Sequence, residues 1–502
     1  MERKSLLFPV LAAADVLLFH LIANPHYGFF RDELYFIICG RHPQWGYVDQ
    51  PPVIPLLAAG SQMFGISLFA LRAVSAIFAA ASVFVTCRLA QELGGGLFAQ
   101  ALAATGTAFA PILANFGAMV APDTVGLWAW PLLALYVVRI AKGADPRWWL
   151  AAGAVAGIAL ESKYSAAFFL AAAIAALLLT KERSVLGTSW FFAGALAALL
   201  IALPNVLWQA HYGFPMIELL RHGQQGKNVE LSPLGFVLQQ PLITNPVLAL
   251  VWIAGLVWAL RNAGARWIGL AYVLLVALMI GLHAKNYYAC DVYPMMFAAG
   301  GAAIESWTAR ALLVRPAALA AATICSAMLL PLVVPVLPIP QFIAYRNALA
   351  RVLPLDSTIT EHHKQSVLPQ TYADMQAWPQ LADAVARVYD SLPPAQQRRA
   401  VIAASNYGEA SAIEFFAGRR LPPVISGHNQ YFLWGTHGAS GDVVIDVNGD
   451  CGASMKLFRT AARAATFSAP YVMPYEDDLP IMVCRGIKKP LAVIWPAVKD
   501  YN

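Results

Sequence analysis

Long apolar runs dominate the sequence and restrict the folds that it can adopt. About eleven of them approach the roughly 20 residues that an α-helix needs to cross a bilayer core. Every backbone amide in lipid must be paired within the chain, so runs of this length are expected to be helices. The runs cover residues 6–23, 70–90, 97–115, 122–140, 148–162, 165–180, 187–207, 241–260, 267–283, 288–307 and 316–337.

The composition supports the same fold class. Of the 502 residues, 59% are hydrophobic and 12% are charged, and the mean hydropathy is +0.58. Soluble globular domains carry about 25% charged residues. We therefore predict a polytopic α-helical membrane protein with about 11 transmembrane helices, a count that rests on the length of a span.

The placement of Lys and Arg predicts the orientation of the chain. Alternate connecting segments hold most of the basic residues and few acids, which marks them as cytoplasmic. Their basic residues are Arg3, Lys4, Arg88, Arg139, Lys142, Arg147, Lys181, Arg183, Arg261, Arg266, Arg310 and Arg315. The N-terminus is then cytoplasmic, while the first external loop, 24–69, lies on the opposite side. This placement explains the net charge of +6 without a nucleic-acid partner, for which the chain carries no motif.

Residues 339–502 differ in character from the transmembrane domain predicted over residues 1–338. Charges become frequent, and segments with strand patterning (398–405, 422–427 and 441–449) alternate with segments of helical periodicity (381–392 and 408–418). This alternation predicts a soluble α/β domain outside the cytoplasm. There Cys451 and Cys484 can form a disulfide or remain two thiols, and we leave both alternatives open. The other cysteines show no metal-ligand spacing, so we expect no metal site.

The first external loop holds an unusual concentration of charge. The stretch FFRDELYFIICGRHPQWGYVDQPPVIPLLA, residues 29–58, contains Arg31, Asp32, Glu33 and Asp49 in a chain that is poor in charge. We expect the acidic pair to lie on a short amphipathic helix, and the run 53–66 to form an interfacial helix because it is too short to cross a bilayer. Asp49 precedes Gln-Pro-Pro and is expected to be a turn residue.

The predicted topology brings further polar residues to the same face of the membrane. Charges at membrane depth are costly and usually line a polar cavity. Members of this set, taken singly, have simpler explanations, namely helix capping for Asp123 and snorkelling for Lys163. An aromatic belt explains Tyr287 and Tyr288. It does not explain the cation and amide beside them, so we expect this segment to contact substrate. Its residues are His283, Lys285, Asn286, Tyr287 and Tyr288.

Transfer of a sugar from a lipid phosphate fits these constraints. Phosphate is a good leaving group that needs a cation to hold it, and an incoming hydroxyl or amine needs a carboxylate to accept its proton. The lipid chain requires an apolar groove, which explains an enzyme embedded in the membrane. A transporter or lipid flippase is the main alternative. We find no internal repeat, however, and the charges gather on one side. A sensory protein that acts through its external tail is a third alternative.

Several stretches resemble the bacterial family 39-like glycosyltransferases of the GT-C superfamily. These are related to dolichyl-phosphate-mannose protein mannosyltransferases and to the lipid A aminoarabinose transferase. The resemblance rests on the stretch 29–58 and on LPNVLWQAHYGFP (203–215), GKNVELSPLGFVLQQ (226–240), KNYYACDVYPMMFAAG (285–300), ASNYGEASAIEFF (404–416) and ISGHNQYFLWG (425–435), with similar text at 68–96. It implies a GT-C-like fold in the bacterial inner membrane, with the C-terminal domain in the periplasm or outside the cell.

The resemblance also implies roles for particular residues. Asp32 matches the catalytic base of the superfamily with Glu33 as its supporter, and Asp123 matches a second acid that helps to place the acceptor. Lys163, Lys285 and Arg31 are our candidates for the donor phosphate, chiefly on their chemistry. The implied donor is a polyprenyl-phosphate sugar, transferred with inversion by a hexosyl- or pentosyltransferase. Lipid A or lipopolysaccharide, a cell-wall glycan and a protein remain open as acceptors. No cofactor is implied, and a divalent metal is left open.

The stretch SGHNQYFLW, Ser426 to Trp434, lies in the predicted soluble domain. This stretch could recognise the acceptor, but its apolar content favours a place in the core of the domain. We therefore expect most of it to be buried.

Overall fold

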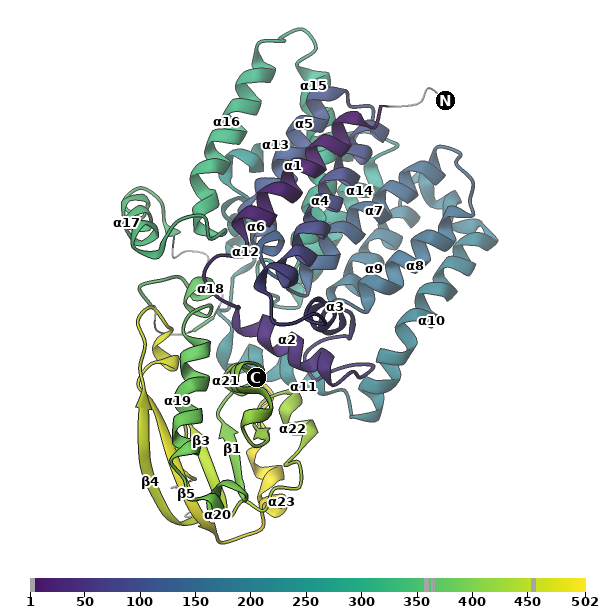
Figure 1. The fold of residues 1–502 in the computed structure, drawn as a ribbon. Coiled ribbons are helices and arrows are strands. Elements are labelled where there is room, and N and C mark those ends of the chain that lie inside the picture. Colours follow the sequence, from purple (N-terminus) through teal and green to yellow (C-terminus); the bar gives the residue numbers. More distant parts are fainter. Residues whose placement is uncertain (1–4, 356–360, 363, 365, 453–456) are drawn as a thin grey trace.

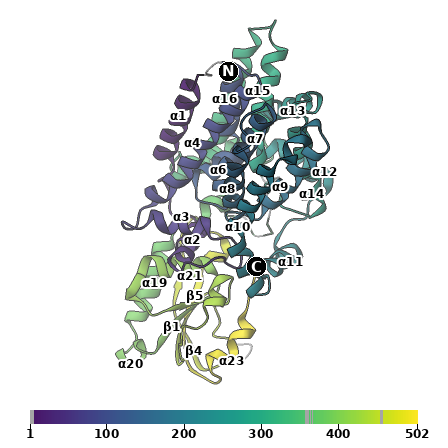
Figure 2. The same ribbon diagram turned by 90° about the vertical axis from the view of Figure 1, so that its right-hand side faces the viewer.

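The computed structural model describes residues 5–355, 361, 362, 364, 366–452 and 457–502. A large helical bundle forms one part of the molecule, and a small mixed α/β unit packs against one end of it (Figure 1). The start of α1 (Leu7–Ala23), near the first described residues, lies at the far end of the bundle from the sheet, as Figure 2 also shows.

Each predicted span coincides with helical structure. The helices of the bundle are α1 (Leu7–Ala23), α4 (Leu68–Glu92), α5 (Leu97–Phe109), α6 (Pro111–Ala118), α7 (Asp123–Ala141), α8 (Trp148–Leu160), α9 (Ser165–Leu178), α10 (Ser189–His211), α12 (Pro233–Ile243), α13 (Pro246–Arg261), α14 (Arg266–Gly281), α15 (Tyr293–Trp307) and α16 (Val314–Leu329). Long apolar faces on α10 and α16 remain uncovered by the protein, as expected for helices that face lipid.

The number of helices that cross the membrane is lower by strict criteria than the predicted eleven. Four helices of the described chain are long and apolar enough to span, and three bent pairs raise this to seven if each is one span. Two of these pairs break at a proline. Pro111 lies at a bend of 62° between α5 and α6, and Pro246 at a bend of 112° between α12 and α13. The exact count of eleven stays a prediction.

Two short helices lie between the bundle and the sheet unit (Figure 1). They are α2 (Arg31–Arg41), which carries the Arg-Asp-Glu triplet, and α3 (Val53–Ser61). The sequence predicted a helix in each place. Five consecutive residues of α2, Leu34 to Ile38, are buried, so this helix is enclosed on nearly all sides and is not the half-exposed amphipathic helix that was expected.

The C-terminal unit contains a five-stranded sheet in the order β2-β1-β3-β5-β4. The strands are β1 (Ala400–Ala404), β2 (Val424–Ile425), β3 (Val443–Val447), β4 (Phe458–Phe467) and β5 (Leu479–Ile487). Strands β1, β2 and β3 are parallel, and β5 runs antiparallel to both β3 and β4. Helices α19 (Trp378–Asp390) and α21 (Tyr407–Ala417) pack against the sheet, and α21 lies at the end toward the bundle, next to α2 (Figure 1).

The first three strands and both covering helices agree with the predicted segments, whereas β4 and β5 were missed. Strand β4 (FRTAARAATF) lies at the edge of the sheet and is exposed along most of its length. It therefore lacks the apolar alternation that marks a half-buried strand.

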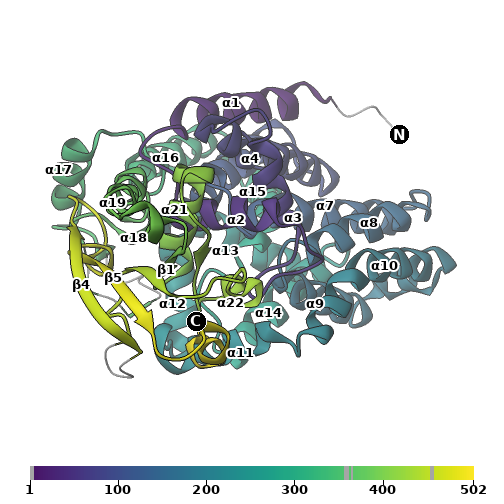
Figure 3. The same cartoon turned by 60° about the horizontal axis from the view of Figure 1, so that its bottom comes forward.

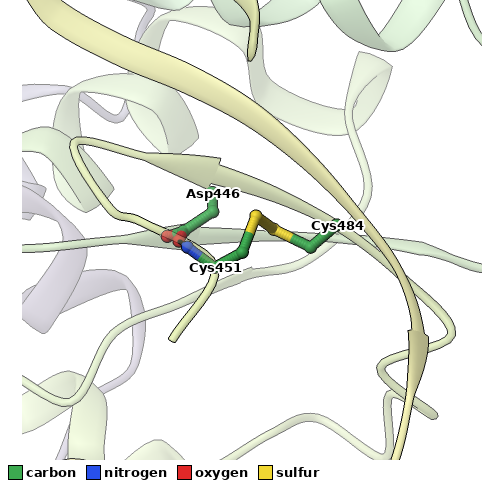
Figure 4. Close-up of a disulfide and its surroundings, with 3 residues drawn as sticks. All are labelled: Asp446, Cys451 and Cys484. Carbon is green, nitrogen blue, oxygen red and sulfur yellow. Dashed lines mark hydrogen bonds between the residues drawn. A yellow bond between two sulfur atoms is a disulfide. The ribbon is translucent and has the colours of Figure 1, made fainter. Parts of the chain in front are cut away.

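Cys451 and Cys484 form a disulfide in the sheet unit (Figure 4), so the first of the two open alternatives is correct. Cys484 lies on β5, and Cys451 lies in the turn that follows β3. The backbone N–H of Cys451 donates to Asp446 Oδ2 at 2.8 Å, which ties the turn to β3. The disulfide therefore links the end of one central strand to its antiparallel neighbour.

Replacing both cysteines by serine should lower the stability of the sheet unit. The bond closes a loop of 33 residues, which corresponds to about 3–4 kcal/mol by the loop-entropy relation. We expect faster proteolysis of the C-terminal unit in the Cys451→Ser/Cys484→Ser variant, and Cys325→Ser serves as the control. Equal proteolysis of all three proteins would contradict this expectation.

Candidate active site

A cavity of about 700 Å³ opens where the bundle, the short helices and the sheet unit meet. This volume lies within the range of small-molecule sites. The polar part of its wall combines α2, the start of α7, the α8–α9 turn and α21. These polar residues are Arg31, Asp32, Asp49, Asn115, Asp123, Lys163, Asn286, Arg346, Glu361, Asp374 and Tyr407.

The structure brings together most of the residues that the sequence singled out. Seven predicted site residues line the cavity, namely Arg31, Asp32, Asp123, Lys163, Asn286, Tyr287 and Tyr288. Glu33, Lys285 and His283 lie outside its lining. Seven of the ten predicted site residues therefore share one cavity.

Asp32 is the second residue of α2 and is partly exposed to the cavity. Its Oδ1 accepts a hydrogen bond of 2.7 Å from the hydroxyl of Tyr407, at the start of α21. In the described part of the chain no other hydrogen bond reaches this carboxylate. Oδ2 is therefore left to a substrate hydroxyl or amine, as a general base requires.

Glu33 lies on the opposite side of α2 from the cavity. Its carboxylate forms an ion pair with Arg72 of α4, and neither side chain has any solvent exposure. Arg72 Nε donates to Glu33 Oε1 at 3.2 Å and Nη2 donates to Oε2 at 3.0 Å, a bidentate pair. Arg72 also donates to three backbone carbonyls of the loop before α2, those of Asn24, His26 and Gly28.

The Glu33 carboxylate also accepts two backbone amides. Oε2 accepts the N–H of Phe30, which caps the start of α2, and Oε1 accepts the N–H of Val120, just before α7. Every lone pair that this geometry offers is thus used within the protein. We expected Glu33 to act beside Asp32 in the cavity. Because its carboxylate is buried and fully paired, it cannot contact a substrate there, and its contacts instead hold α2 in position.

Asp123 is the first residue of α7 and is almost fully buried. Its Oδ1 forms an ion pair with the ammonium of Lys163, from the turn between α8 and α9, and accepts a weak bond of 3.5 Å from Cys290 Sγ. The capping alternative for Asp123 is wrong, because the N-cap position is Pro122 and the Asp123 side chain makes no cap bond. The pair places a cation and a carboxylate together at the cavity wall.

Asp291 adds a second buried carboxylate beside this pair. One ligand atom each from Asp123, Cys290 and Asp291 lies within 4.8 Å of the others, a set that could hold a metal ion. Asp291 Oδ2 has no hydrogen-bond partner in the described part of the chain. Lys163 already supplies positive charge to the set through Asp123, so the expectation of no metal is kept as a prediction.

Lys285 and His283 have a different environment from the one expected. Lys285 Nζ donates to Glu361 Oε1 at 2.5 Å, and this ion pair is mostly buried. His283 lies on an exposed turn with a positive φ of 50°. Lys285 is thus already paired with a carboxylate, and neither Lys285 nor His283 is part of the cavity lining.

Asn286, Tyr287 and Tyr288 form part of the cavity wall as predicted. The amide of Asn286 is held by Gln239, whose Oε1 accepts from Nδ2 at 2.6 Å, so this side chain is partly committed to packing. The rings of Tyr287 and Tyr288 lie 5.7 and 5.0 Å from Lys163 Nζ, within the range of cation–π contacts. The two tyrosines thus surround the Lys163 ammonium.

The Arg31 side chain lines the cavity but makes its closest contacts with residues of the sheet unit. Its guanidinium carbon lies 4.5 Å from the ring centre of Tyr407 and 5.8 Å from that of Tyr475. Its backbone N–H donates to the carbonyl of Asp374 at 3.0 Å. Nε of Arg31 has no hydrogen-bond partner in the described residues. Arg31 therefore joins α2 to the sheet unit, in addition to touching the cavity.

Three buried carboxylates balance the Arg31 charge in this junction. Burial raises the pKa of Asp374 to about 6, although Arg31 opposes the shift. Burial likewise raises the pKa of Glu409 to about 7 and that of Glu476 well above its ordinary value. Removal from water is the main cause of the raised pKa in all three acids.

Some site residues were missed or misread from the sequence. Asp49 lies in a bend as expected, but it also lines the cavity, and its Oδ1 accepts from the Tyr35 hydroxyl at 3.1 Å. Arg346, on α17 (Ile339–Leu349), and Tyr407 reach the cavity from the predicted soluble domain. The resemblance at 404–416 was the one sequence signal that pointed to Tyr407.

The stretch Ser426 to Trp434 is largely buried, which confirms the expectation of domain core. It also docks on the first external loop, because Gln430 Oε1 accepts the N–H of Val48 at 3.1 Å and the Tyr35 hydroxyl accepts the N–H of Gln430 at 3.2 Å.

Comparison with known proteins agrees with the predicted resemblance. A family model described as dolichyl-phosphate-mannose-protein mannosyltransferase matches residues 49–208, a segment that contains Asp123 and Lys163. No curated protein matches the chain.

The fold is shared with solved glycosyltransferase structures. ArnT from Cupriavidus metallidurans, bound to undecaprenyl phosphate, has a TM-score of 0.59 at 15% identity, and its apo state has a TM-score of 0.60 at 14%. Each match covers 94% of this chain and 97% of ArnT. Arabinofuranosyltransferase AftD from Mycobacteria has a TM-score of 0.55 at 14% identity, and the match covers 97% of this chain and 40% of AftD.

These findings confirm the predicted resemblance to GT-C glycosyltransferases related to the mannosyltransferases and to the lipid A aminoarabinose transferase. The helical GT-C-like fold with a C-terminal sheet region is likewise confirmed.

The two neighbouring acids of α2 should respond differently to loss of charge. Glu33→Gln leaves Arg72 buried without an anionic partner, which typically costs about 3–5 kcal/mol. Asp32→Asn keeps an acceptor oxygen for the Tyr407 hydroxyl, loses only the charge at the cavity surface and should cost at most about 1 kcal/mol. Thermal unfolding of the purified protein in detergent measures the difference. Equal losses in the two variants would show that the buried pair does not anchor α2.

Proposed function

We propose that the chain is an integral-membrane glycosyltransferase that moves a sugar from a polyprenyl-phosphate donor to an acceptor outside the cytoplasm. The observation that carries this proposal is that a carboxylate with one oxygen open to the cavity, Asp32, and a cation, Lys163, line one cavity that also has an apolar wall. Each part of the cavity matches one part of the proposed substrate.

The donor phosphate would lie against Lys163. Its ammonium already holds Asp123, and an ammonium has three donors, so a phosphate oxygen can be added without breaking the pair. Tyr287 and Tyr288 flank the ammonium and shield it from water, which strengthens its attraction for an anion. Lys163 is therefore the main candidate for the donor phosphate, and Lys285 and Arg31 are secondary because other carboxylates and rings occupy them.

The lipid chain of the donor would follow the apolar wall. This wall comes from the ends of α16 and α12 and from α11 (Pro215–His222). Its apolar residues include Met216, Leu220, Leu242, Ile243, Leu329, Leu332 and Val333. Burying a chain of CH₂ groups against such a wall is favourable by about 0.8 kcal/mol per group.

Asp32 would act as the general base. As the acceptor hydroxyl or amine attacks the anomeric carbon of the sugar, its proton moves to Asp32 Oδ2. The bond between the anomeric carbon and the phosphate oxygen breaks, and the phosphate leaves with the electron pair toward Lys163. A single displacement of this kind inverts the configuration at the anomeric carbon. Asp123 holds Lys163 in place and supports the acceptor side of the cavity.

The relatives support the class of substrate. The structure of ArnT contains undecaprenyl phosphate, and the family model and AftD carry the names of a mannosyltransferase and an arabinofuranosyltransferase. We infer a polyprenyl-phosphate donor with a hexose or pentose for this chain. Lipid A or lipopolysaccharide, a cell-wall glycan or a protein would be the acceptor.

The same proposal places the protein in the bacterial inner membrane as a multi-pass protein with its C-terminal domain in the periplasm. The basic connecting segments support a cytoplasmic N-terminus. The disulfide in the sheet unit supports an oxidising compartment for that domain.

Asp32→Asn should reduce sugar transfer by about 10²–10⁴-fold, because the variant removes the proton acceptor. We would measure transfer to endogenous acceptors in membranes supplied with undecaprenyl phosphate carrying labelled mannose or arabinofuranose. Asp383→Asn, an exposed acid on α19, is the matched control. Full activity of Asp32→Asn, with a donor that the wild type uses, would refute the assignment of Asp32 as the general base.

Lys163→Gln should weaken binding of undecaprenyl phosphate by about 10–100-fold, the effect of losing one charge-assisted hydrogen bond. Binding can be measured on the purified protein without knowledge of the sugar or the acceptor. Lys499→Gln, which alters an exposed ion pair with Glu218, serves as the control. Unchanged affinity in Lys163→Gln together with a loss in Lys285→Gln would move the phosphate site to Lys285.

A further inference from the structure

The candidate base is contacted by a residue of the C-terminal unit. Tyr407 and Asp32 are 375 positions apart, yet the Tyr407 hydroxyl donates to Asp32 Oδ1 at 2.7 Å. In the part of the chain that the structure describes, this is the one hydrogen bond to the Asp32 side chain. Both residues line the cavity. Helix α21 lies directly against α2, which Figure 3 shows from the side of the sheet.

Tyr407 is held firmly in this position. It is the first residue of α21, whose N-cap Asn406 accepts the N–H of Glu409 at 3.0 Å. Its ring packs against Tyr35 of α2, with ring centres 4.6 Å apart, and its own N–H donates to His428 Nδ1 at 3.3 Å. The orientation of the hydroxyl is thus set by contacts on both sides of the junction.

The neighbouring residues are shaped for this contact. A Cβ at Gly408 would lie 2.6 Å from Cγ and Nε of Arg31, so the Arg31 side chain would have to shift to admit any larger residue. Glu409 is locked in turn, because its carboxylate accepts from Ser405 N–H, Asn406 Nδ2 and Asn448 Nδ2. The start of α21 is therefore a rigid platform against which α2 rests.

We propose that Tyr407 is a positioning residue for Asp32, so that the C-terminal unit completes the active site of the transferase. The inference rests on the proposed function. Oδ1 of the carboxylate is occupied by the tyrosine, which turns Oδ2 toward the acceptor. A hydrogen bond donated to a carboxylate also fixes the orientation of the carboxylate group. Burial raises the pKa of Tyr407, so its hydroxyl remains the donor.

The hydroxyl can be removed with little change in shape. In Tyr407→Phe the ring contacts with Tyr35 and Arg31 are kept and only the bond to Asp32 is lost. We expect kcat for sugar transfer to fall about 10-fold or more, with KM for the donor nearly unchanged, because the bond acts on the base and not on the phosphate site.

The charged groups that face Asp32 and Tyr407 are Arg31, Asp49 and Asp374, and all three stay in place in this variant. Tyr431→Phe is the matched control. It removes another buried hydroxyl of the same unit, one that contacts Ser411 and Glu414, and it should leave kcat and KM unchanged. Thermal unfolding of both variants would detect a loss of folding.

A double variant separates this inference from the proposed function. If Asp32 is the base, Tyr407→Phe should have almost no further effect in the Asp32→Asn background. An inactive Asp32→Asn with a Tyr407→Phe that keeps its kcat would overturn the positioning role alone. An Asp32→Asn variant with full transfer activity would show that Asp32 is not the base and would overturn both the catalytic assignment and this inference.

Discussion

The buried ion pair between Glu33 and Arg72 organises the region around the cavity. A guanidinium without solvent exposure is tolerated only where acceptors surround it, and here two carboxylate oxygens and three carbonyls do so at 2.7–3.2 Å. The pair joins the end of α1, the start of α2 and helix α4. Through the bond from Val120 N–H to Glu33 it also reaches the segment that leads into α7. Asp32 is next to Glu33 on α2, and Asp123 comes three residues after Val120. The Glu33–Arg72 pair therefore helps to set the relative positions of the two acids in the cavity.

The first external loop gains its shape from two sides. Helix α10 of the bundle holds it through Asn205 and Gln209, whose amides donate to the carbonyls of Trp45 and Tyr47 at 3.0 Å. The C-terminal unit holds the loop through Gln430, whose Oε1 accepts the N–H of Val48 in the loop. A loop fixed in this way can present Asp49 and the Pro-Pro segment to the cavity without forming regular structure. Residues of both the bundle and the sheet unit line the cavity, so neither part forms it alone.

The junction also carries a charge balance that responds to pH. Arg31 lies among Asp374, Glu409 and Glu476, whose carboxylates are raised in pKa by burial. For Asp374 the folded pKa of about 6 exceeds the ordinary value of 3.8, so the folded state binds more protons between these values. This contribution to stability is greatest at low pH and is lost as the pH rises through about 6. The attraction of Arg31 for the ionised acids offsets that loss, which explains why a buried cation lies at this point.

Local patterning was sufficient for much of the architecture. Apolar run length predicted where the bundle helices lie, and period alternation predicted β1, β2, β3, α19 and α21, because these signals are carried by neighbouring residues. Charge in an apolar chain singled out Asp32, Asp123 and Lys163, and they share a cavity. The partners of the charged residues, in contrast, could not be predicted from local sequence. Glu33 with Arg72, Lys285 with Glu361, and Asp32 with Tyr407 join residues 39, 76 and 375 positions apart. No periodicity encodes such pairs. They exist only when the helices and the sheet unit pack together, and this packing leaves Asp32 open to the cavity while its neighbour Glu33 is buried.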